Sequence, residues 1–107
     1  MNDVEKVKNY DKELKQELKI INNLIINTPF LEKIKHPIKL IKNYQTKFYL
    51  NKRRKGYDNI YSRLTYYGMK IGYLRTNDIS DDLIHNYNVY EKKLVKYVDK
   101  HPIKRWF

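Results

Sequence analysis

The sequence predicts an all-α protein, a small single domain of four to five helices. Two long segments, 3–26 and 80–100, repeat apolar residues at the spacing of one helix face. At 107 residues, with 41% hydrophobic and 33% charged residues, the chain has the size and composition of one ordinary globular domain. We therefore expect one helical domain over 1–107, in which a basic, tyrosine-rich segment, 28–76, separates the two long helices.

The first predicted helix is amphipathic and covers residues 3–26. An acid, Asp11, interrupts its apolar stripe where the next apolar residue should fall. Thr28 can cap a short helix that follows, Pro29 suits the first turn of that helix, and His36-Pro37 would end it. The apolar stripe consists of Val4, Val7, Leu14, Leu18, Ile21 and Ile25.

A second long helix is predicted from Ile38 to the region of Gly56, which would terminate it. Successive residues turn by about 100°, which gives an apolar side, expected to face the core, and a basic side, expected to face solvent. Because Lys52 and Lys55 intrude on the apolar side, the regular helix is expected to end near Asn51. The apolar side carries Ile38, Leu40, Ile41, Tyr44 and Phe48, and the basic side carries Lys39, Lys42, Lys47, Arg53 and Arg54.

Residues 57–75 combine features of an α-helix with features of β-strands. Apolar residues at helical spacing favour a helix, whereas the content of tyrosine, isoleucine and threonine favours strands. We expect a helix over 58–67 and keep a short β-hairpin within 60–75, across Gly68 to Gly72, as the alternative. The residues at helical spacing are Ile60, Leu64, Tyr67 and Ile71.

The last predicted helix, 80–100, has well-defined ends. Ser80 is a favourable N-cap, and Asp81 and Asp82 place negative charge in the first turn, where it complements the helix dipole. The His101-Pro102 dipeptide ends the helix. Its apolar face is formed by Leu83, Tyr87, Tyr90, Leu94 and Val98.

The net charge of +11 is concentrated in the middle of the chain. Residues 1–27 hold five basic residues and five acids, and residues 77–107 hold six and five. The segment 28–76 holds twelve basic residues against two acids, a net charge of +10, together with seven of the eleven tyrosines. A charge block between balanced segments indicates a surface that faces a polyanion.

This composition predicts a small accessory protein that binds DNA or RNA. Lysine and arginine neutralise phosphates, and tyrosine rings stack on unpaired bases, which favours single strands over duplex. The candidate nucleic-acid-binding residues are Lys39, Lys42, Lys47, Lys52, Arg53, Arg54, Lys55, Tyr57, Tyr61, Arg63, Tyr66, Lys70, Tyr73 and Arg75.

Two other interpretations of the basic segment stay open. A helix-turn-helix centred on Gly56, with Asn59, Ser62 and Arg63 leading the second helix, would bind duplex instead. Alternatively, the tyrosines pack the core and keep only their hydroxyls at its edge. The tyrosines concerned are Tyr57, Tyr61, Tyr66, Tyr67 and Tyr73.

No motif predicts catalysis or a cofactor. The repeated His-Pro-Ile-Lys at His36 and His101 has no nearby carboxylate cluster with which to bind a metal. Asp81 and His85 have the spacing of a base and its orienting partner, but no nucleophile accompanies them. We therefore expect no enzyme activity, no metal and no cofactor.

The alternative function is a subunit or inhibitor that docks on a larger nucleic-acid-processing protein. Asp11 could set the register of an intermolecular helix pair, and Trp106 and Phe107 could anchor a partner. The same residues have a simpler explanation, in which Asp11 is exposed and the two aromatic rings fold back onto the core.

The sequence also predicts an intracellular, cytoplasmic protein. The longest uncharged stretch, 20–31, has twelve residues, too few to span a bilayer, and the first fifteen residues lack the apolar core of a signal peptide. A basic amphipathic helix could lie on an anionic membrane. Because the flanking helices are balanced in charge, we expect no membrane partner.

Overall fold

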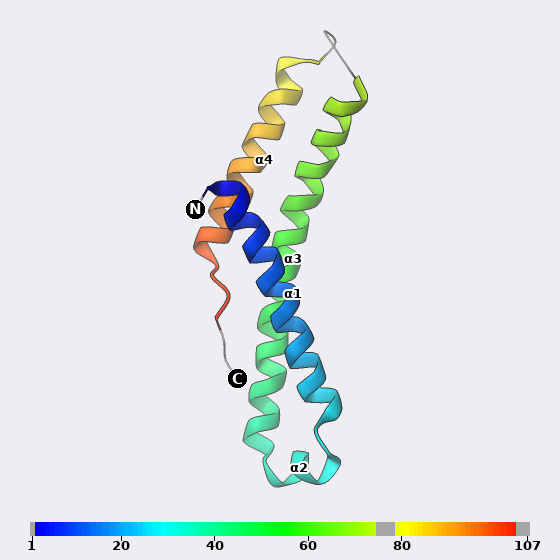
Figure 1. Ribbon diagram of the computed structural model, residues 1–107, viewed down its shortest axis with the longest axis vertical. Helices are drawn as coiled ribbons and strands as arrows, with labels where there is room; N and C mark the ends of the chain where they lie inside the picture. The colour runs from blue at the N-terminus through cyan, green and yellow to red at the C-terminus, as the bar shows by residue number, and fades with distance from the viewer. Residues whose placement is uncertain (1, 75–78, 105–107) are drawn as a thin grey trace.

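A computed structural model of the chain describes residues 2–74 and 79–104. In these ranges four α-helices follow one another: α1 (Asp3–Asn27), α2 (Phe30–Lys35), α3 (Pro37–Leu74) and α4 (Asp81–Lys100). α1 packs along one half of α3 and α4 along the other, while α2 lies across the end at which α1 and α3 are joined (Figure 1). The prediction of an all-α fold with four to five helices is confirmed.

Side-chain caps determine where α1 and α4 begin. The Asn2 side chain accepts a hydrogen bond from the amide of Glu5 at 2.8 Å, and the Ser80 hydroxyl accepts one from the amide of Leu83 at 3.2 Å. Each cap supplies a side-chain acceptor to an amide of the first turn, where the N–H groups lack the usual carbonyl partner four residues earlier in the helix. These local signals explain why both helices start within one residue of the predicted positions.

α3 is one continuous helix of 38 residues, where the sequence predicted an interruption at Gly56. The predicted helix end near Asn51, the turn of the helix-turn-helix motif and the β-hairpin within 60–75 are therefore wrong, and no strand occurs in residues 2–74 or 79–104. Gly56 has a packing role instead. A Cβ atom at this position would lie 2.7 Å from Cζ of Tyr97 in α4, which is closer than side chains tolerate.

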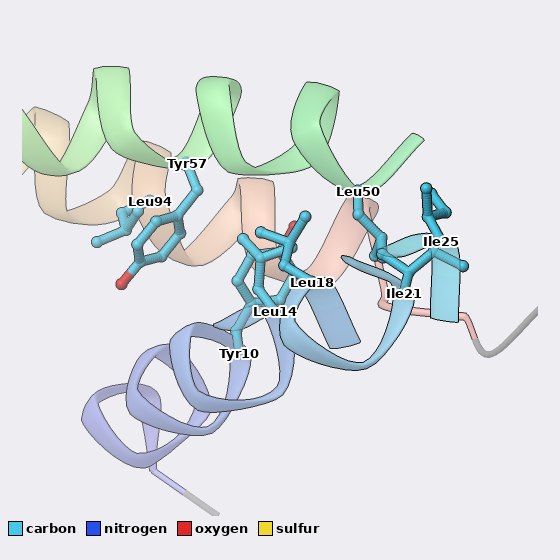
Figure 2. Packing of buried hydrophobic residues seen from close by; sticks show 8 residues of the cluster. All are labelled: Tyr10, Leu14, Leu18, Ile21, Ile25, Leu50, Tyr57 and Leu94. Atoms are coloured by element: carbon cyan, nitrogen blue, oxygen red, sulfur yellow. The ribbon is translucent and has the colours of Figure 1, made fainter. Parts of the chain in front are cut away.

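The core lies along α3, between this helix and its two long neighbours (Figure 2). Leu50 and Tyr57 of α3 meet Leu94 of α4 and a row of side chains from α1. That row contains the last four residues of the predicted apolar stripe and one residue outside it, Tyr10. It consists of Tyr10, Leu14, Leu18, Ile21 and Ile25.

The side of α3 that faces the core is opposite to the one predicted from residues 38–48. Ile38, Ile41, Tyr44 and Phe48 are exposed and Leu40 is half-buried, whereas Thr46 and Leu50 are buried. Since α3 continues past Gly56, the side that it turns toward the core is determined by residues along most of its length. These core-facing residues are alternately four and three positions apart and extend over seven turns. They are Thr46, Leu50, Arg53, Tyr57, Ile60, Leu64, Tyr67 and Ile71.

The molecule is a rod of 65 × 24 × 18 Å with a radius of gyration of 18.7 Å. A compact domain of this length would have a radius of gyration of roughly 13 Å. The accessible surface is 8458 Å², whereas a compact monomer of the same mass exposes roughly 6,400 Å². The large exposed area includes the side of α3 that faces away from α1 and α4.

Candidate nucleic-acid interface

One exposed side of α3 combines basic and aromatic side chains. It lies opposite the buried residues Thr46, Leu50 and Tyr57, given a turn of about 100° per residue. We call this surface the outer face of α3. It comprises Tyr44, Phe48, Lys52, Lys55, Arg63, Tyr66, Lys70 and Tyr73, all of which are exposed.

The outer face of α3 contains no acid. Asp58 is the single acidic residue in the 38 residues of α3, and it forms an ion pair with Arg54 at 3.5 Å on a different side of the helix. Among the described residues, no carboxylate pairs with the four basic side chains of the outer face. Their charges are therefore available to an external anion.

The aromatic rings of the outer face extend into solvent. The side chain of Tyr73 is 88% exposed and that of Phe48 is 73% exposed. The ammonium group of Lys70 lies 5.3 Å from the centre of the Tyr66 ring, so a charge and a ring meet in one place. At a rise of about 1.5 Å per residue, Tyr44 and Tyr73 are separated by roughly 44 Å along the helix. This length accommodates several nucleotides of an extended strand.

Arg53, a predicted phosphate contact, is used within the protein. Its Nη1 donates a hydrogen bond to Nδ1 of His101 at 2.8 Å, and its guanidinium lies 4.8 Å from the centre of the Tyr49 ring. The hydroxyl of Tyr97 donates to the backbone carbonyl of Arg53 at 3.0 Å. Burial, followed by the charge of Arg53, lowers the pKa of His101. Arg53 thus attaches the end of α4 to α3.

The other predicted basic residues are divided among several surfaces. Arg54 pairs with Asp58 and lines a cavity rather than the outer face. Lys39 and Lys42 are exposed near the α2 end of the rod, and Lys47 is half-buried. Four of the predicted basic residues that the structure describes share one face of α3 with exposed aromatic rings. They are Lys52, Lys55, Arg63 and Lys70.

The predicted stacking residues Tyr57 and Tyr61 belong to the interior and its edge. Tyr57 is buried, and burial raises its pKa to about 12. Its ring is nearly parallel to that of Tyr61, with 5.7 Å between the ring centres, and lies 5.4 Å from the ring of Tyr10. One side of the Tyr61 ring is therefore occupied, and Tyr57 cannot reach a base.

A cavity of about 440 Å³ opens beside these rings, between α1, α3 and α4. Its walls are apolar and aromatic, and its rim carries charges of both signs. Two rim acids, Asp11 and Asp58, pair with Lys15 at 3.0 Å and with Arg54 at 3.5 Å. The wall residues include Val7, Leu14, Tyr57, Tyr61, Tyr87 and Leu94.

Tyr44 and Phe48 are the functional candidates that the sequence reasoning missed, because it placed them in the core. The signal that could have identified them is the spacing of Ile60, Leu64, Tyr67 and Ile71. Continued backward in steps of three and four, this spacing reaches Tyr57, Leu50 and Thr46. It therefore places Tyr44 and Phe48 on the opposite side of the helix.

Three predicted residues, Arg75, Trp106 and Phe107, lie outside the described residues. Within the described part, no group of three or more His, Asp or Glu side chains is arranged to hold a metal ion. His36 approaches Glu32 at 3.6 Å, and His101 contacts Arg53. The histidines of the two His-Pro-Ile-Lys segments thus have different partners, Glu32 one turn earlier for His36 and Arg53 of α3 for His101.

None of the described helices is both long enough and apolar enough to cross a membrane. Comparison with known proteins yields no relative from which a function could be transferred: no protein-family model, no curated protein and no solved structure matches the chain significantly.

Proposed function

We propose that this protein binds nucleic acid through the outer face of α3, with a preference for single strands, and acts as a small accessory protein in the cytoplasm. The observation that carries this proposal is the acid-free, exposed surface that combines four basic side chains with four aromatic rings. Phosphates would be neutralised by Lys52, Lys55, Arg63 and Lys70. Unpaired bases would stack on the exposed rings.

Exposed rings support single strands over duplex. Bases in a duplex already stack on one another, whereas an unpaired base gains about 1–3 kcal/mol when it stacks on an aromatic side chain. The side chains of Tyr66 and Tyr73 are exposed on α3, so an unpaired base can reach their rings. A surface that bound only duplex phosphates would not require these rings.

The alternative function, docking on a larger nucleic-acid-processing protein, receives less support. It drew on Asp11 as an acid in an apolar stripe that could set the register of an intermolecular helix pair, and Asp11 pairs with Lys15 of its own helix at 3.0 Å. Its other basis, Trp106 and Phe107, lies outside the described residues. We assign no reaction, metal or cofactor to the protein.

The proposal is tested by fluorescence anisotropy with a labelled single-stranded oligonucleotide and a duplex of equal length, each as DNA and as RNA. Replacing Tyr66 and Tyr73 by alanine should weaken single-strand binding by about 1–3 kcal/mol per base contacted, with little change in salt dependence. The Tyr66→Phe/Tyr73→Phe variant keeps both rings and should bind nearly as the wild type does. Binding that survives the alanine changes would remove the stacking role.

Charge is tested separately with Lys52→Gln/Lys55→Gln. This variant should bind single strands more weakly. The slope of log K against log salt concentration should also become less steep, by about 0.7 for each phosphate that is no longer neutralised. The matched control is Lys92→Gln/Lys96→Gln, which removes two exposed charges from α4. Equal effects of the two variants would mean that overall charge, not the outer face of α3, determines binding.

A further inference from the structure

The end of the rod that carries α2 exposes several large apolar side chains. Nothing in α2 is buried, and this short helix lies across the end of the α1–α3 pair (Figure 1). Five side chains from three successive helices are 60–75% exposed here. We call them the apolar tip; they are Ile26, Phe30, Leu31, Ile34 and Ile38.

The surroundings of the apolar tip are strongly basic. Between residues 18 and 57 the chain contains one acid, Glu32, and this acid lies 3.6 Å from the imidazole of His36. The exposed or half-exposed lysines nearest in sequence to the apolar tip are Lys33, Lys35, Lys39 and Lys42. Whatever covers the apolar tip must therefore be both apolar and negatively charged.

The apolar tip protrudes rather than lining a groove. Two cavities, of about 310 and 370 Å³, open near this end of the rod. Their walls include Ile38 but none of the other four residues of the apolar tip. A partner helix that binds a groove would thus find no groove formed by Phe30, Leu31 and Ile34, whereas a deformable apolar layer can surround protruding side chains.

We propose that the apolar tip inserts into the interface of an anionic lipid bilayer, while the surrounding lysines contact the lipid head groups. A nucleic acid would account for the lysines but not for the exposed Phe30 and Leu31. A second copy of the chain, bound through the same surface, would bring two sets of lysines together. An anionic bilayer accounts for both features, because apolar side chains and basic residues act together at its surface.

The geometry allows this contact while most of the outer face of α3 stays uncovered, since only Tyr44 lies as near as about 9 Å to Ile38 along the helix. Interfacial side chains enter a bilayer by roughly 5–10 Å, whereas Lys52 lies about 21 Å further along α3 than Ile38, at a rise of 1.5 Å per residue. Binding to lipid therefore does not depend on the proposed nucleic-acid function. It departs from the expectation of no membrane partner and involves no membrane-spanning helix.

The test is flotation of the full chain with vesicles made of one part phosphatidylserine and two parts phosphatidylcholine, compared with vesicles of phosphatidylcholine alone. The wild type should float with the anionic vesicles and remain unbound with the neutral ones. Phe30→Ser/Leu31→Ser should lower the partition coefficient about tenfold or more for each side chain. Lys35→Gln/Lys39→Gln should lower it about fivefold for each lysine.

Matched controls keep the result interpretable. Val4→Ser/Ile84→Ser removes two exposed apolar side chains from other parts of the rod, and Lys92→Gln/Lys96→Gln removes two lysines from α4; both should float as the wild type does. Circular dichroism should show that every variant keeps its helix content. The proposal fails if Phe30→Ser/Leu31→Ser floats like the wild type. It also fails if the wild type does not float with the anionic vesicles; a dimer in light scattering that this variant abolishes would then identify a second copy of the chain as the partner.

Discussion

The phenol ring of Tyr97 occupies the space in which a side chain at position 56 would lie. A Cβ atom on Gly56 would stand 2.7 Å from Cζ and 2.9 Å from Cε2 of this ring. The Tyr97 hydroxyl also donates a hydrogen bond to the Arg53 carbonyl, one turn earlier in α3. The absence of a side chain at residue 56 thus allows α4 to approach α3 closely.

Gly56→Ala should therefore destabilise the protein, although alanine is the better helix former by about 1 kcal/mol. Overpacking of a closely packed contact costs about 1–3 kcal/mol, and this should dominate the free energy of unfolding measured in urea. Gly72→Ala is the matched control, because a Cβ at that position would meet no side chain or other helix of the described residues within 4 Å; it should stabilise the protein by about 0.4–1 kcal/mol. Combining Gly56→Ala with Tyr97→Leu should reduce the cost of the alanine. Equal effects of the two glycine substitutions would contradict the packing role.

The orientation of α3 makes opposite predictions for two neighbouring residues. Leu50 is fully buried and Phe48 is 73% exposed. Leu50→Ala should lower the free energy of unfolding by about 2–5 kcal/mol, whereas Phe48→Ala should change it by about 0.5 kcal/mol or less. Urea denaturation of both variants checks this. A larger loss at Phe48 would restore the orientation predicted from residues 38–48.

Arg53 and Lys52 are adjacent in sequence, but their substitutions should affect different properties: stability for Arg53 and nucleic-acid binding for Lys52. Arg53→Gln removes the hydrogen bond to His101 and the contact with the Tyr49 ring, so it should lower the free energy of unfolding by about 1 kcal/mol. Lys52→Gln, on the outer face of α3, should leave stability almost unchanged and weaken nucleic-acid binding. Thermal unfolding and anisotropy, measured on both variants, separate the two roles. Unchanged stability in Arg53→Gln would show that its interior contacts contribute little.

The stability of the protein should fall in mild acid because of His101. Its Nδ1 can accept from Arg53 only when it is unprotonated, and burial together with the charge of Arg53 lowers its pKa in the folded state. In the unfolded chain the imidazole of His101 has a pKa of about 6.5. It therefore binds a proton more readily there than in the folded protein. The stabilisation is therefore present above about pH 6.5 and is lost as the pH falls toward the lowered pKa of the folded state.

The measurement is the difference in unfolding free energy between about pH 7.5 and about pH 5.5, a range in which histidines titrate. This difference should be smaller in His101→Asn than in the wild type. His85→Gln changes an exposed histidine in α4 and should behave as the wild type does. An unchanged pH dependence in His101→Asn would exclude His101 as its source.

The candidate interface was predictable only in part. Charge segregation identified the segment 28–76, and Lys52, Lys55, Arg63, Tyr66, Lys70 and Tyr73 were proposed from it and lie on the outer face of α3. Whether a given lysine or tyrosine faces solvent depends on the helix phase, which composition does not determine. The burial of Arg53 and Tyr57 depends on this phase. Composition alone therefore predicts them as residues that contact the nucleic acid, although both side chains have partners within the protein.

The sequence by itself determined the helical class, the starts of α1 and α4 and the position of the basic segment. These features are local: Asn2 and Ser80 cap nearby amides, and charge is a property of composition. Tertiary structure decided that α3 continues through Gly56 and that most of the apolar side chains of residues 38–48 are exposed. In an isolated chain glycine weakens a helix, and the compensating contact with Tyr97 exists only after α4 has packed against α3.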